Sequence, residues 1–90
     1  MKLTDRAEVA PDVLARQVGD ETVVLDLPSG TYFGLDRIGA HVWEAIVGGR
    51  TFAEACDVIE REFEVERDVV ERDVLRLADT LLEKKLITVR

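Results

Sequence analysis

The sequence predicts an α+β domain that resembles a winged helix-turn-helix, with a three-stranded antiparallel sheet followed by three helices. Short β-branched segments separated by turn residues occupy the first third of the chain. Helical periodicity then begins near Asp36 and continues almost to the end. A chain of 90 residues suffices for one modest core. We therefore expect one domain over residues 13–90, preceded by a flexible arm at residues 1–12, where no hydrophobic period is visible.

Three segments have the composition of strands: Val13–Val18, Thr22–Leu27 and Thr31–Leu35. The letters "GDE" separate the first two, and "PSG" separates the second from the third, where Gly30 can adopt the left-handed conformation of a tight turn. In such a meander the second strand is central, so the third is left at an edge. Alternation along the central strand places three apolar side chains on one face: Val23, Leu25 and Leu27.

The boundaries of the first two helices are marked by capping residues. Asp36 is a favourable N-cap for the first helix, and Gly48 and Gly49 end it. Thr51 opens the second helix, and Glu54 stands three residues later, which is the pattern of a capping box.

The last helix is predicted from about Arg67 to Lys85, after a break at residues 64–65, and "LITVR" follows as a short extended tail. This helix carries two apolar seams, whereas one would suffice to cover a small core. The first seam consists of Val70, Val74, Leu77 and Leu81, and the second of Leu75, Ala78 and Leu82. Either the helix is central and packs on both sides, or part of the second seam lines a groove for a partner.

Charge and composition exclude several classes of function. The net charge of −7, with five acids against Arg61 alone over residues 51–64, argues against nucleic-acid binding. No apolar run is long enough to span a bilayer, and the first residues lack the apolar core of a signal peptide. The single cysteine, Cys56, agrees with a reducing compartment, so we expect a cytoplasmic protein.

No pattern in the chain indicates catalysis. The lone histidine, His41, has no serine, cysteine or second histidine at a partnering offset, and Cys56 falls on the apolar face of the second helix. Zinc, phosphate-loop and EF-hand motifs are absent from the sequence. We therefore expect a protein that is not an enzyme and that binds neither a metal nor a cofactor.

The predicted edge strand "TYFGL" is the most informative segment. Proteins usually protect such edges with lysine or proline, and this strand has neither. Gly34 interrupts it where a side chain is expected, so Gly34 either permits close approach of another backbone or forms a bulge before Asp36. An unprotected edge beside a long apolar helix favours the addition of a peptide strand.

The sequence resembles the PqqD-like family of precursor-peptide recognition elements. Three stretches carry the resemblance, which covers about residues 13–89: "TVVLDLPSGTYFGLDRIGAHVWEAI", "GRTFAEACDVI" and "VVERDVLRLADTLLEKKLI". Their shared pieces are Gly30 with Tyr32, Leu35 with Gly39, the helix of Trp43, and the run Asp73, Val74, Leu77 and Leu81. Lys85 departs from the family, in which many members have glycine at this position.

The resemblance implies a non-catalytic adaptor that binds the leader of a ribosomally made precursor peptide and presents it to a leader peptidase and a macrocyclase in lasso-peptide biosynthesis. One alternative is a peptide chaperone for a radical-SAM enzyme, in the pyrroloquinoline quinone pathway or a similar one. A second is a dimerising winged-helix module with a structural or regulatory role. We expect a monomer or weak homodimer that binds no nucleic acid and no membrane.

The family binds its leader between the third strand and the third helix. The peptide-binding residues that this implies are Thr31, Tyr32, Phe33, Gly34 and Leu35 in the strand and Asp73, Val74, Arg76, Leu77 and Leu81 in the helix. Alternation separates Thr31, Phe33 and Leu35 from Tyr32 and Gly34, and either set could face the ligand.

Overall fold

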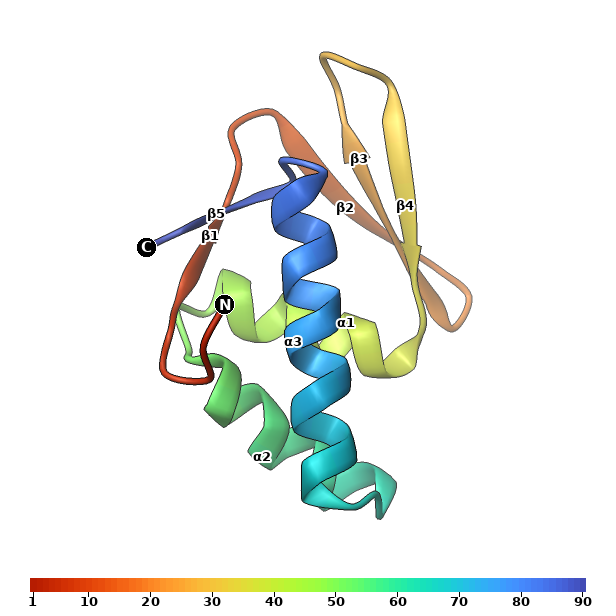
Figure 1. Cartoon of the computed structure of the whole chain (residues 1–90). Coiled ribbons are helices and arrows are strands. Elements are labelled where there is room, and N and C mark those ends of the chain that lie inside the picture. Colours follow the sequence, from red (N-terminus) through yellow and green to blue (C-terminus); the bar gives the residue numbers. More distant parts are fainter.

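A computed structural model describes all 90 residues of the chain and shows an antiparallel meander followed by three helices (Figure 1). Strands β2 (Val13–Val18), β3 (Glu21–Asp26) and β4 (Thr31–Leu35) form one sheet in the order β2-β3-β4. The predicted α+β class, with its central second strand and its third strand at an edge, is therefore confirmed. Its likeness to a winged helix-turn-helix stays a prediction.

The helices are α1 (Arg37–Val47), α2 (Phe52–Phe63) and α3 (Arg67–Glu83), and the first two begin where the capping residues indicate. The Asp36 side chain accepts a hydrogen bond from the Gly39 backbone N–H, and Gly48 caps the other end of α1. Thr51 and Glu54 form the expected reciprocal capping box. These local signals therefore define the starts of α1 and α2 to within a residue, whereas the Glu66 side chain makes no capping hydrogen bond at the start of α3.

Helix α3 ends in a left-handed residue that is not glycine. Lys85 has φ +62°, and its N–H bonds to the Leu82 carbonyl, while the Leu86 N–H bonds to the Leu81 carbonyl. This is the hydrogen-bond pattern of a Schellman motif, which usually places glycine at the Lys85 position. The chain thus completes the expected turn despite lacking the usual residue.

The N-terminal segment differs from the flexible arm that the sequence analysis expects. Strand β1 (Ala7–Val9) pairs antiparallel with β5 (Ile87–Val89), and Ala7 is completely buried. Before it, the Leu3 and Asp5 carbonyls accept hydrogen bonds from the first residues of α2. The two partners are 80 residues apart in sequence, so a search for local periodicity cannot find their pairing.

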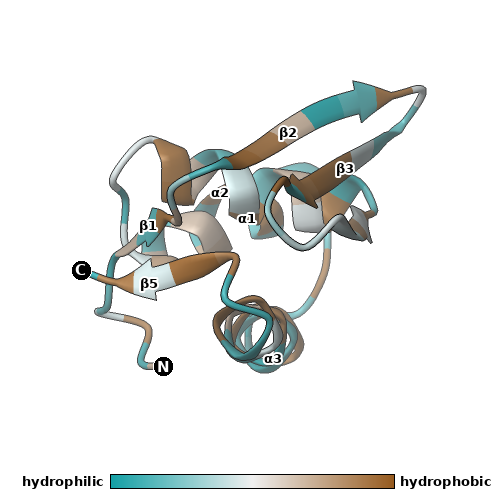
Figure 2. Ribbon diagram, turned by 90° about the horizontal axis from the view of Figure 1, so that it is seen from above, coloured by the Kyte–Doolittle hydropathy of each residue, from teal (hydrophilic) through white to brown (hydrophobic).

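The core lies where the three helices meet one face of the sheet (Figures 1 and 2). Val24 of β3 faces this core and is fully buried. The alternating set Val23, Leu25 and Leu27 lies on the opposite, outer face, where Leu27 is 52% exposed. No helix is both long and apolar enough to cross a membrane.

Candidate functional site

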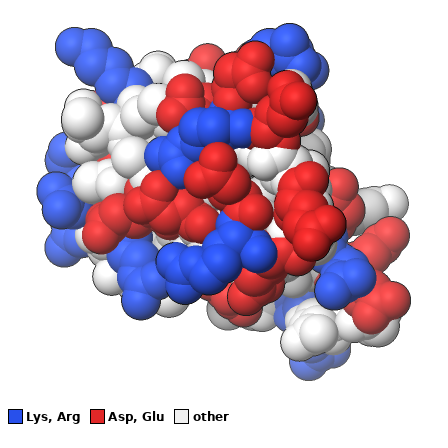
Figure 3. Space-filling view, turned by 90° about the horizontal axis from the view of Figure 1, so that it is seen from below, with Lys and Arg blue, Asp and Glu red and all other residues white.

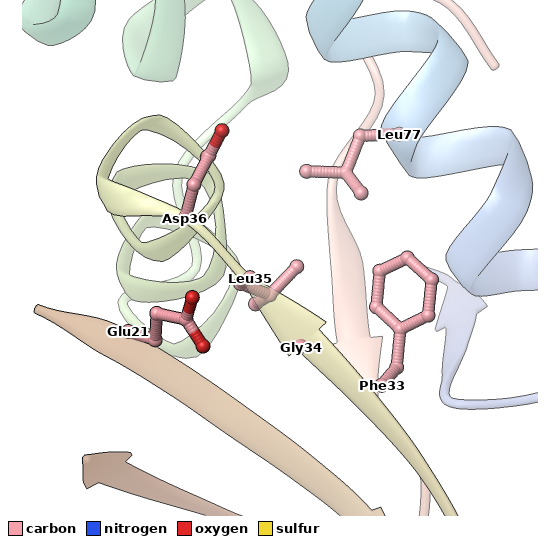
Figure 4. A pocket seen from close by; sticks show the side chains of 6 residues that line it. All are labelled: Glu21, Phe33, Gly34, Leu35, Asp36 and Leu77. Carbon is pink, nitrogen blue, oxygen red and sulfur yellow. The ribbon is translucent and has the colours of Figure 1, made fainter.

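A hollow of the surface lies between the edge strand β4 and helix α3 (Figure 4). It is an open cleft of about 350 Å³, and its wall is formed by Glu21, Phe33, Gly34, Leu35, Asp36 and Leu77. Strand β4 pairs only with β3, so no strand of this chain occupies its outer side. An exposed backbone edge and an apolar wall therefore meet in one groove, which we call the β4–α3 groove.

Alternation along β4 decides which side chains enter this groove. Phe33 lies opposite Val24 in the register and packs against the core, whereas Tyr32 points to the outer face and is 73% exposed. Leu35 is 2% exposed and anchors the end of the strand. A Cβ on residue 39 would lie 3.2 Å from the Leu35 side chain. Glycine at position 39 therefore leaves the space in which Leu35 packs against the start of α1.

Helix α3 contributes one side chain, Leu77, to the wall of the groove. Leu77 is partly buried and stands opposite Phe33 and Leu35 (Figure 4). Leu77 belongs to the first predicted seam, so the groove does not use the second seam. Ala78 of that second seam is buried in the core, and Leu82 is 36% exposed outside the groove.

Charged groups outside the ten residues predicted to bind peptide also lie at the groove. Glu21 and Asp36 line it where β4 meets α1. The Lys84 ammonium lies 5.6 Å from the centroid of the Phe33 ring, in a cation–π arrangement. Glu21 is the first residue of β3 and Asp36 has an evident role as a helix cap, so only the strand register reveals that they share a site.

Gly34 has no structural role within the free protein. Its register with Val23 is continuous with the neighbouring pairs, so the bulge interpretation is wrong. A Cβ at this position would meet no atom within 4 Å, and its φ is not positive. The fold therefore tolerates a side chain here, and any need for glycine comes from outside the chain.

The ten residues predicted to bind peptide divide into three groups. Four of them line the groove: Phe33, Gly34, Leu35 and Leu77. Thr31, Tyr32, Asp73 and Arg76 are exposed around it, and Asp73 lies 3.9 Å from Arg76. Val74 and Leu81 are 1% and 0% exposed, so they support the groove from within the core and present no surface to a ligand.

The groups that could carry chemistry lie elsewhere and have structural contacts. His41 Nε2 is 3.1 Å from a Glu62 carboxylate oxygen, and its ring meets Phe63 edge to face. Cys56 is buried, and this desolvation raises the pKa of its thiol. No group of three His, Cys, Asp or Glu side chains is placed to hold a metal ion.

The charge pattern of the helical end is mixed, with acidic groups in excess. Figure 3 shows this end from below, with Asp and Glu interspersed among Lys and Arg. Arg67 lies among carboxylates, at 2.6 Å from Asp57 and 2.8 Å from Glu71. This arrangement provides no continuous basic surface on the face shown.

Fold and groove together define a small α+β protein that presents a free strand edge beside an apolar helix. The chain belongs to the PqqD family: residues 21–87 match the family described as Coenzyme PQQ synthesis protein D. Comparison with curated protein sequences gives no match.

Two solved structures share this fold over nearly their whole length. TbiB1 in complex with the TbiA(beta) leader peptide is 36% identical, with a TM-score of 0.81 over 89% of this chain and 93% of TbiB1. Lasso peptide synthetase B1 complexed with the leader peptide is 28% identical, with a TM-score of 0.84 over 92% of this chain and 98% of that protein. Both of these similar proteins were therefore captured with a leader peptide bound.

Proposed function

We propose that this protein is a non-catalytic recognition element that binds the leader of a ribosomally made precursor peptide in the β4–α3 groove. The observation that carries the proposal is the free edge of β4 beside the apolar wall formed by Phe33 and Leu77. Strand addition uses such an edge for affinity and adjacent pockets for specificity. The leader complexes of the two similar structures support the same assignment.

The energetics require both parts of the groove. Alternate residues of the five in β4 direct their backbone groups outward, which allows roughly four or five new hydrogen bonds. At about 0.5–1.5 kcal/mol net each, these bonds barely offset the entropy lost when a flexible leader becomes ordered. One or two apolar leader side chains packed against Phe33 and Leu77 add about 1.5–3 kcal/mol each. The sum is compatible with a dissociation constant near 1 μM, which corresponds to about −8 kcal/mol.

The proposed role is that of an adaptor acting in the cytoplasm. It captures the unmodified precursor and presents it to a separate leader peptidase, and through that enzyme to a macrocyclase. The similarity to a lasso peptide synthetase B1 favours the lasso pathway over a pyrroloquinoline quinone chaperone. No step of this role requires a cofactor or a metal.

Binding of the TbiA(beta) leader peptide tests the proposal directly. We expect saturable binding in fluorescence anisotropy, with amides of Thr31–Leu35 gaining protection from hydrogen exchange and those of Glu21–Asp26 changing little. Binding that leaves the β4 amides unprotected would refute the groove. The rival, a dimerising module, predicts self-association that the peptide does not reverse, which mass measurement in solution with and without peptide detects.

A further inference from the structure

The two ends of the β4–α3 groove carry charges of opposite sign. Glu21 and Asp36 line the end where β4 meets α1, and Glu21 takes part in no ion pair. Asp36 uses Oδ1 for the helix cap, at 2.8 Å from the Gly39 nitrogen. At the other end, the Lys84 ammonium lies over Phe33 and has no carboxylate partner. A peptide that follows β4 therefore passes from negative to positive surroundings.

Three further charged groups lie on the outer surface of α3 and are close to one another. Asp73 Oδ1 is 3.9 Å from Arg76 Nη1 and 3.8 Å from Arg72 Nε. All three side chains are more than half exposed, so solvent screens them further. The charges that line the groove or lie over its wall are thus the carboxylates of Glu21 and Asp36 at one end and the ammonium of Lys84 at the other.

The spacing of these charges matches a short extended peptide. Phe33 and Asp36 are three residues apart, which corresponds to roughly 10 Å along a strand. This exceeds the Debye length of about 8 Å at physiological ionic strength, so each end interacts mainly with the nearest peptide side chain. The two ends of the groove therefore interact with charged peptide side chains at two separate positions.

The direction of the peptide follows from the stability of the pairing. An antiparallel pair of strands is slightly more stable per residue than a parallel pair. A peptide antiparallel to β4 has its N-terminal side near Asp36 and its C-terminal side near Phe33. Resting on the proposed function, we propose that the leader segment on β4 carries a basic side chain followed three or four residues later by an acidic one. Glu21 and Lys84 determine this order.

A display experiment with random 12-residue peptides tests the charge order. Peptides are selected on the wild-type protein and on a variant that combines Glu21→Lys with Lys84→Glu. The wild type should enrich peptides with base before acid, and the exchanged variant the reverse. Synthetic peptides of the two orders should differ about tenfold in dissociation constant, because two exposed pairs change from attraction to repulsion.

A matched control exchanges charges outside the groove, with Lys2→Glu and Asp68→Lys, and should select the wild-type order. Selected peptides that protect β4 amides but show no charge order, or the same order in the exchanged variant, would overturn this inference and leave the proposed function intact. If no peptide is enriched, or if enriched peptides leave β4 unprotected, the proposed function fails and the inference fails with it.

Discussion

Shortening Leu77 probes the helical wall of the groove. The change Leu77→Ala removes three carbon groups, each worth about 0.8 kcal/mol when buried. Leu77 is only partly buried in the free protein, and a bound peptide would complete its burial. We therefore expect about 1.5 kcal/mol of lost folding stability and about 1 kcal/mol of lost peptide binding, which is close to a fivefold rise in dissociation constant.

The same substitution at Leu82 is the matched control. Leu82 lies five residues later, about 140° around the helix from Leu77, and is 36% exposed outside the groove. Leu82→Ala should cost similar stability without changing peptide affinity. Urea denaturation gives the first quantity, and anisotropy titration with the TbiA(beta) leader peptide gives the second. Equal affinities for the two variants would show that the helix does not contact the peptide.

Three further substitutions test other parts of the structure. Gly34→Val should fold normally, because its Cβ has open space, yet weaken leader binding; unchanged affinity in anisotropy would remove Gly34 from the contact line. Trp43→Ala, at a core position that is 5% exposed, should cost about 3–5 kcal/mol in urea denaturation; a folded variant that has lost only peptide binding would contradict this. Lys85→Gly should relieve the positive φ and gain about 0.5–1 kcal/mol in thermal denaturation, whereas Glu83→Gly loses about 1 kcal/mol; a loss at both positions would refute the strain argument.

Elements set by neighbouring residues could be predicted from the sequence. The capping box of Thr51 and Glu54, the N-cap of Asp36 and the order of the meander all depend on residues within a few positions of one another. The pairing of β1 with β5 depends on contacts between distant segments, which no local period records.

The groove was predictable in outline but not in all its residues. Helical spacing places Val74, Leu77 and Leu81 on one seam, yet the seam is wider than the groove, so only Leu77 reaches the surface there. The carboxylates of Glu21 and Asp36 come together because their positions are adjacent across β3 and β4. Their common site therefore required the three-dimensional register.

The ribbon of β1 and β5 has a consequence for the order in which the domain assembles. Ala7, a core residue from the start of the chain, is held by a strand whose only partner is Ile87–Val89. During synthesis, the meander and the first helices can form while β1 still waits for that partner to leave the ribosome. Although β1 is made before the meander, it is thus among the last strands to dock, and contacts of such long sequence separation slow folding. Weakening Ile87 should consequently loosen β1 together with β5, while the Leu3 and Asp5 carbonyls keep their hydrogen bonds to α2.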